Sequence, residues 1–183
     1  MQEKIILAVL EEIKIHALRF RMIDVTKRLH MSKTSLYHMV DSKTKLINET
    51  IDYLMERFNK QEQEIRSLDV STRQKVSMLI QLYTKSFTHF DRSLYSDLRV
   101  DYELEWKRWA KFREEKINTL LEILQEGINK GELRNVNLSV MKECLLMVSK
   151  VLFDSEFLQK NNLTISMAME SFSDILFVGI EKK

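Results

Sequence analysis

Proline is absent from all 183 residues of the chain, and glycine occurs only three times. Both residues interrupt helices, so a chain this poor in them can form long helices with few breaks. Hydrophobic residues make up 44% of the sequence and charged residues 31%, values typical of a folded protein rather than a disordered one. The composition therefore predicts an all-α protein.

The sequence contains no pattern for export or membrane insertion. No stretch approaches the roughly 18 uncharged apolar residues of a membrane span. Glu11 and Glu12 lie where a signal peptide would need an apolar run. Cys144 is the only cysteine, so no disulfide can form within the chain, and we expect it to be a small core residue rather than a nucleophile. These features favour a cytoplasmic protein.

Apolar residues recur at helical spacing along most of the chain. The spacing predicts a first helix up to about residue 17, short helices over about 22–29 and 32–40, and a fourth from about 43 to 60. A helix over about 71–90 follows. The next is a long helix that begins near Tyr102 and ends at Gly131, where a left-handed cap is expected.

The last two predicted helices, "LSVMKECLLMVSKVLF" and "TISMAMESFSDILFVGI", are apolar on more than one face. A helix of this kind is buried on several sides, and in so small a protein this favours a partner chain. We therefore expect a homodimer that pairs these helices in a four-helix bundle. The apolar residues of the two helices are too many and too widely spread for one monomeric core: Leu145, Leu146, Val148, Val151, Leu152, Phe172, Leu176 and Phe177.

Two of the short helices, joined through "LHMS", have the pattern of a helix-turn-helix. Such a motif needs a small shared core, and apolar residues stand at the required places (Val25, Leu29, Met31, Leu36). The turn needs a residue that tolerates positive φ, and His30 is of a type enriched in that conformation. Ser32 is a good N-cap for the second helix of the motif, and Ser42 for the helix that follows.

The motif lies in a basic segment. Between Ala17 and Lys45 there are seven basic and two acidic residues, a net charge of +5, although the whole chain carries only +2. A basic patch of this kind favours a polyanion as partner. Side chains suited to phosphate oxygens and base edges are expected on the outer surface of the third helix, with one more cation at the start of the fourth (Lys33, Thr34, Ser35, Tyr37, His38, Lys43).

The segment "FRMIDVTKRLHMSKTSLYHMVDSKTKLINETI" resembles the tetracycline-repressor (TetR) family of transcriptional regulators. The matching positions are Val25, Met31, Ser32, Leu36, Tyr37, Lys43 and Leu46. The C-terminal segments "ILQEGINKGELR" and "ILFVGI" are similar to family members in a weaker way. The chain departs from the family pattern at Thr26, at His30 and at Met39-Val40. It also departs at Arg21, which replaces a usual threonine and is a further candidate for phosphate contact.

The resemblance implies a helix-turn-helix DNA-binding domain over residues 1–45, with the fourth helix (43–60) as a connector. It also implies an effector-binding and dimerisation domain over residues 46–183. The implied function is a homodimeric regulator, most simply a repressor released from a palindromic operator by a small apolar effector. The aromatic residues Phe87, Tyr102, Trp106 and Trp109 are candidates for the effector pocket, although aromatic residues at helical spacing more often belong to a core.

A second hypothesis is a helical interaction module or small enzyme whose degenerate helix-turn-helix no longer binds DNA. The sequence gives little support to catalysis. No cluster of His, Cys, Asp or Glu has metal-ligand spacing, and three glycines cannot build a phosphate-binding loop. We therefore expect no enzyme activity, no metal and no cofactor. The sequence leaves open the operator, the effector, and repression versus activation.

Overall fold

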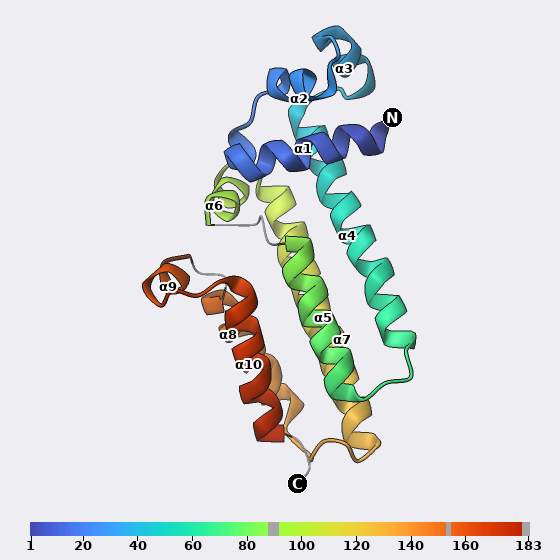
Figure 1. Cartoon of the computed structure of the whole chain (residues 1–183), viewed down its shortest axis with the longest axis vertical. Helices are drawn as coiled ribbons and strands as arrows, with labels where there is room; N and C mark the ends of the chain where they lie inside the picture. The colour runs from blue at the N-terminus through green and yellow to red at the C-terminus, as the bar shows by residue number, and fades with distance from the viewer. Residues whose placement is uncertain (88–91, 153–154, 181–183) are drawn as a thin grey trace. The chain divides into compact units, whose positions relative to one another are not determined.

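The computed structural model describes residues 1–87, 92–152 and 155–180, and its secondary-structure elements are helices (Figure 1). The all-α prediction is therefore confirmed. In chain order the elements are α1 (Gln2–His16), the 3-10 helix η1 (Ala17–Arg19), α2 (Met22–Leu29), α3 (Lys33–Met39), α4 (Lys43–Ser67), α5 (Thr72–Phe87), α6 (Arg92–Asp101), α7 (Glu103–Asn129), α8 (Leu138–Leu152), α9 (Ser155–Lys160) and α10 (Ile165–Ile180).

Spatial contacts divide the chain into two compact units. Unit 1 comprises residues 1–57 and 89–109, and unit 2 comprises residues 58–88 and 110–183. The unit boundaries fall within α4 and α7. The functional boundary expected between residues 45 and 46 stays a prediction, because it concerns which residues bind DNA rather than which residues pack together.

In unit 1, helices α2 and α3 have the local signals of a helix-turn-helix. At the start of α2 the Asp24 carboxylate accepts hydrogen bonds from the backbone N–H of Arg21 at 3.0 Å and from its guanidinium at 3.2 Å. His30 ends α2 in the left-handed conformation, with φ 52°, as the sequence predicted. The Ser32 hydroxyl accepts a hydrogen bond from the backbone N–H of Ser35 at 3.0 Å and so caps α3. The Ser42 hydroxyl caps α4 in the same way through the N–H of Lys45, at 3.1 Å.

The predicted apolar core of the helix-turn-helix is confirmed in part. Val9, Val25 and Leu36 are fully buried, whereas Leu29 and Met31 of the predicted motif core are only partly buried. Sequence periodicity did not predict α6, which packs against η1. Its Leu94 and Leu98 are buried at an i, i+4 spacing, the one signal that was available.

In unit 2, α5 and α7 approach closely where α5 begins. A Cβ added to Gly127 of α7 would lie 2.5 Å from Thr72 Oγ1 and 2.8 Å from Thr72 Cγ2. Beyond the helix, Gly131 has φ 75°, so the predicted left-handed cap is confirmed. The predicted end of α5 at Phe90 lies outside the described residues.

Helices α8 and α10 lie side by side, and α10 also packs against α5 (Figure 1). Leu145, Leu152, Leu176 and Phe177 are buried within the chain itself. The expectation that one monomeric core has no room for these residues is therefore wrong for these four, because α5 and α7 of the same chain supply neighbours that the helical pattern alone could not assign. The apolar side chains that do remain exposed on the two helices are Val140, Met147, Val151, Met167, Ile175 and Val178.

Cys144 is exposed on α8, so its assignment to the core is wrong. It lies at helical spacing between the exposed residues Val140 and Met147, on the same side of the helix. None of the described helices combines the length and the apolar character that a bilayer crossing requires.

Candidate functional site

The outer surface of α3 presents four side chains beside one shallow surface depression: Lys33, Thr34, Tyr37 and His38. All four are exposed, and the Tyr37 side chain retains 41% of its accessible surface although it is aromatic. The ammonium of Lys33 lies 5.7 Å from the centre of the Tyr37 ring. The predicted cation, hydroxyls and imidazole thus share one face of the second helix of the motif, and together they can donate to phosphate oxygens and base edges.

Ser35 lies on the same helix but is partly buried, and its groups are used inside the motif. Its N–H donates to the Ser32 hydroxyl, and the two hydroxyl oxygens are 2.8 Å apart. These contacts fix the first turn of α3. In the structure Ser35 is therefore the partner of the N-cap residue Ser32, in addition to its predicted role at the surface.

Arg21 is exposed and forms an ion pair with Asp24, with Nε 3.2 Å from Oδ2. The hydrogen bond from the guanidinium lowers the pKa of the Asp24 carboxyl below its usual value, and the same pair raises the pKa of Arg21. Water and salt screen an exposed pair of this kind, so it contributes little to stability. The Arg21 side chain can therefore exchange Asp24 for a phosphate at little cost.

Lys43 at the start of α4 is turned toward the interior of unit 1. Its Nζ donates to the backbone carbonyl of Leu18 at 2.5 Å and lies 4.6 Å from the centre of the Phe20 ring. Burial lowers the pKa of the Lys43 ammonium, although the carboxylates of Asp97 and Asp101 act in the opposite direction. Lys43 therefore ties α4 to η1, and it must break this bond before it can reach a phosphate.

Most cations of the basic segment are already engaged within unit 1. Besides Arg21 and Lys43, three others form ion pairs: Arg19 with Asp97, Arg28 with Glu12, and Lys45 with Asp41. Among the residues that the structure describes, Lys27 and Lys33 are the lysines and arginines between Ala17 and Lys45 whose charged group bonds to neither a carboxylate nor a backbone carbonyl. Lys27, exposed on α2, was missed by the sequence analysis because its position in the motif carries no pattern of its own.

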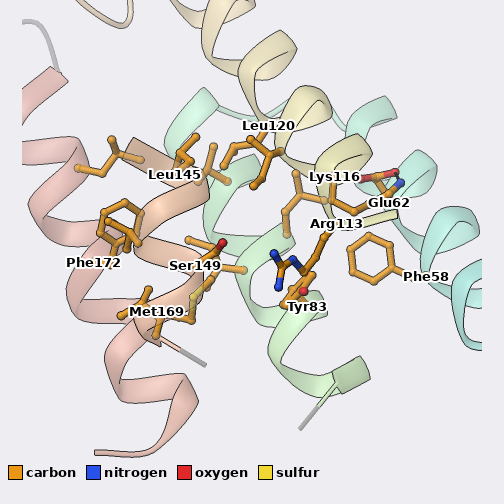
Figure 2. Close-up of a pocket in the computed structure, with 17 residues that line it drawn as sticks. Phe58, Glu62, Tyr83, Arg113, Lys116, Leu120, Leu145, Ser149, Met169 and Phe172 are labelled. Carbon is orange, nitrogen blue, oxygen red and sulfur yellow. Dashed lines mark hydrogen bonds and ion pairs between the residues drawn. The ribbon is translucent and has the colours of Figure 1, made fainter. Parts of the chain in front are cut away.

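Unit 2 contains a cavity of about 110 Å³ between α4, α5, α7, α8 and α10 (Figure 2). Its wall is mainly apolar and includes Phe58, Leu79, Leu145 and Phe172. A concave, mostly apolar space with a few polar groups is typical of small-molecule sites. The cavity thus has the character that the family resemblance implies for an effector pocket.

Three charged side chains line the cavity: Glu62, Arg113 and Lys116. The ammonium of Lys116 lies 2.5 Å from the Glu62 carboxylate and also donates to Asn59 at 2.7 Å. Both side chains of this ion pair are largely covered, with 13% and 9% of their surface exposed. Arg113 has no such partner among the described residues, and its Nε is both covered and without a hydrogen bond.

The four aromatic residues predicted for the pocket do not line this cavity. Phe87 is buried behind its wall, with its ring stacked 5.5 Å from Phe58. Tyr102, Trp106 and Trp109 belong to unit 1. Trp109 is buried there. The pKa of the Tyr102 phenol is raised, mainly by burial and to a lesser extent by nearby carboxylates. Leu79 and Tyr83 line the cavity from α5 at an i, i+4 spacing, but spacing alone could not separate a cavity wall from a core.

In the parts of the chain that the structure describes, no three His, Cys, Asp or Glu side chains gather as metal ligands would.

No family model matches the chain. A curated relative, an uncharacterised HTH-type transcriptional regulator of Bacillus subtilis named YvaF, is 23% identical over 181 residues, which cover 98% of this chain and 95% of the relative. Among solved structures, a TetR transcription regulator from Haloarcula marismortui has a TM-score of 0.75 at 16% identity, with 94% of each chain covered. A regulator from Saccharomonospora viridis has a TM-score of 0.78 at 13% identity, covering 100% of this chain and 98% of that one.

The similarity thus extends over both units and is not confined to the helix-turn-helix. These comparisons confirm the resemblance predicted from the sequence: the chain has the all-helical fold of the TetR family of transcriptional regulators.

Proposed function

We propose that this chain is a DNA-binding transcriptional regulator that acts as a homodimer, and that a small molecule bound in unit 2 releases it from its operator. The observation that carries the proposal is the α3 face, where Lys33, Thr34, Tyr37 and His38 are exposed together behind a properly capped turn at His30. A cation and several hydrogen-bond donors on the second helix of the motif favour DNA binding over the alternative of a degenerate motif. The relatives described above support the same class of function.

In this proposal Lys33 and Tyr37 provide the main phosphate contacts, and Thr34 and His38 reach base edges or phosphates beside them. Lys27 adds a second unpaired cation. Arg21, Ser35 and Lys43 belong to the site as predicted from sequence, but each has to exchange or share a contact that it makes within unit 1. Arg21 does so most easily, because its pair with Asp24 is exposed.

The test is fluorescence anisotropy of the full chain with labelled duplexes from the region upstream of its own gene, measured across a salt series. Each lysine that neutralises a phosphate contributes about 0.9 to the slope of log affinity against log salt concentration. The double variant Lys27→Met Lys33→Met should lower that slope by about two and weaken binding. Lys111→Met, which removes an exposed cation of α7, is the matched control and should leave the slope unchanged. A double variant that binds DNA with the affinity and salt slope of the parent would exclude this surface as the DNA-binding site.

The homodimer is proposed from the exposed apolar side chains of α8 and α10. Val140, Met147 and Val151 follow one line along α8, and Met167, Ile175 and Val178 follow one line along α10, with exposed fractions from 47% to 79%. Two adjacent helices that expose apolar stripes are suited to pair with the same helices of a second copy about a two-fold axis. A two-fold dimer would present two copies of α3, the DNA-reading heads, to successive major grooves about 34–36 Å apart. The operator should therefore be a near-palindrome.

The effector is proposed to bind in the unit 2 cavity. The Saccharomonospora viridis regulator was crystallised with choline, which supports the proposal that a chain of this fold can hold a small organic molecule. The four aromatic residues predicted from the sequence do not line this cavity, so the proposal rests on the residues that do. Release of DNA requires the ligand to favour a dimer conformation in which the heads no longer match the groove spacing.

A further inference from the structure

Arg113 is the unusual member of the cavity lining. It extends from α7, and Figure 2 shows its guanidinium reaching toward Ser149 of α8, beside Tyr83. Its Nε is covered and has no hydrogen-bond partner among the described residues. The residue as a whole is partly buried, and taking part of a guanidinium out of water costs free energy unless an acceptor replaces the lost water. No described side chain fills that role at Arg113.

The other charges of the cavity do not compensate for it. Glu62 already accepts the ammonium of Lys116 at 2.5 Å, and that ammonium also lies over the rings of Phe58 and Phe112, at 5.4 and 5.0 Å from their centres. The Lys116–Glu62 pair is therefore neutral as a unit and satisfied by its neighbours. The lining as a whole carries one uncompensated positive charge, and it belongs to Arg113.

We infer that the cavity binds an amphipathic monoanion, a carboxylate at the end of an apolar chain, with the Arg113 guanidinium as its carboxylate-binding group. A guanidinium presents two parallel N–H donors that match the two oxygens of a carboxylate. The apolar wall provided by Leu79, Leu145 and Phe172 removes the chain from water. This inference rests on the proposed function in that the same cavity would hold the effector, and it names the chemical class of that effector.

The size of the cavity limits the length of the chain. A water molecule needs about 10–15 Å³ on this measure of volume, so about 110 Å³ holds roughly seven to eleven water-sized groups. Octanoate, with eight carbons and two oxygens, is therefore a suitable probe. A longer acid would leave part of its chain outside the cavity.

The experiment is isothermal titration calorimetry of the full chain, without DNA, with three probes that share an eight-carbon chain: octanoate, octan-1-ol and octyltrimethylammonium. Octanoate should bind most tightly and the cation most weakly. Arg113→Met keeps the length of the side chain but removes its charge, and it should weaken octanoate about tenfold to a hundredfold, the range expected for a charged hydrogen bond. Octan-1-ol should bind the variant at least as well as it binds the parent.

Lys111→Met is the matched control, because it removes a cation of α7 that is 80% exposed and does not line the cavity; it should leave octanoate binding unchanged. Arg113→Lys retains the charge without the paired donors and should bind octanoate with intermediate affinity. The melting temperature of Arg113→Met without ligand should equal or exceed that of the parent, which separates lost binding from lost folding. Equal affinity of the parent for octanoate and octan-1-ol, or full affinity in Arg113→Met, overturns the inference.

The two proposals fail separately. A chain that binds operator DNA but shows no preference for the carboxylate overturns this inference and leaves the regulator intact. A chain that binds octanoate through Arg113 but binds no duplex overturns the proposed function and leaves the ligand class standing.

Discussion

Lys43 and Leu18, 25 positions apart in sequence, are joined by a hydrogen bond of 2.5 Å from the lysine ammonium to the leucine carbonyl. The N–H of the same leucine donates to the carboxylate of Asp97 at 3.2 Å. Asp97 is 3% exposed and also pairs with Arg19. The peptide groups of η1 are thus bonded to α4 on one side and to α6 on the other, directly beside Ala17, whose φ of 49° is rare for a residue other than glycine.

Lys43→Met should destabilise the fold by about 1 kcal/mol, because it removes the partner of a partly buried carbonyl. Lys45→Met is the matched control two residues further along α4: its pair with Asp41 is exposed, so the change should cost less. Urea denaturation of both variants measures the difference. If Lys43 also contacts a phosphate, as proposed, the salt slope of DNA binding falls by about one as well. An unchanged slope with reduced stability would assign Lys43 a structural role only.

Met147→Glu and Ile175→Glu should convert the dimer into monomers, because each places a charge on the apolar stripe of α8 or α10. Leu104→Glu alters an apolar residue of α7 that is 72% exposed outside these stripes, and it should leave assembly unchanged. Sedimentation equilibrium at micromolar concentration distinguishes a species of 21.9 kDa from one of twice that mass. A parent chain that is folded and stable as a monomer would contradict the proposed dimer.

Glu132→Gln should remove pH-dependent stability from unit 2. The Glu132 carboxylate accepts the backbone N–H of Thr72 at 2.6 Å, at the start of α5, and this bond lowers the pKa of Glu132 below the usual 4.5. A lowered carboxyl pKa stabilises the folded state above pH 4.5, and this contribution is lost as the pH falls through the folded value. At pH 7 the variant should lose about 1 kcal/mol, by analogy with helix N-caps.

The difference between Glu132→Gln and the parent should therefore shrink when both are unfolded by urea at successively lower pH, below 4.5. Glu126→Gln, a change in an exposed carboxylate on α7, serves as the control. A difference that stays constant across the series would mean that the charge of the Glu132 carboxylate, bound to the N–H of Thr72, does not contribute to stability.

Gly127→Ala should destabilise the protein by about 1–3 kcal/mol, although alanine is the better helix former by about 1 kcal/mol. The added Cβ would lie 2.5 Å from the hydroxyl of Thr72, which is itself buried and bonded to Glu132. Gly179→Ala is the matched control, because a Cβ at this helical glycine has no neighbour within 4 Å. Thermal unfolding should show a lower melting temperature only for the first variant. Two variants that both gain stability would exclude the close packing of α5 and α7.

The sequence by itself determined the helices and the local chemistry of the motif. Helix signals depend on residues within one or two turns, so the left-handed His30 and the capping serines Ser32 and Ser42 could be recognised without neighbours. The same holds for the left-handed cap at Gly131. The exposed donors of α3 followed from its buried Leu36, because one buried residue fixes which side of a short helix faces outward.

Only the tertiary structure decided what each long-range contact does. In the sequence Lys43 is one more cation of a basic segment, but in the structure its ammonium donates a hydrogen bond to the Leu18 carbonyl. Leu145 and Phe177 read as surplus apolar residues, yet they are buried within unit 2, while Met147 and Ile175 remain exposed. The cavity and the uncompensated Arg113 are invisible to periodicity, because burial and pairing depend on which helices meet, and that is set by packing between residues far apart in the chain.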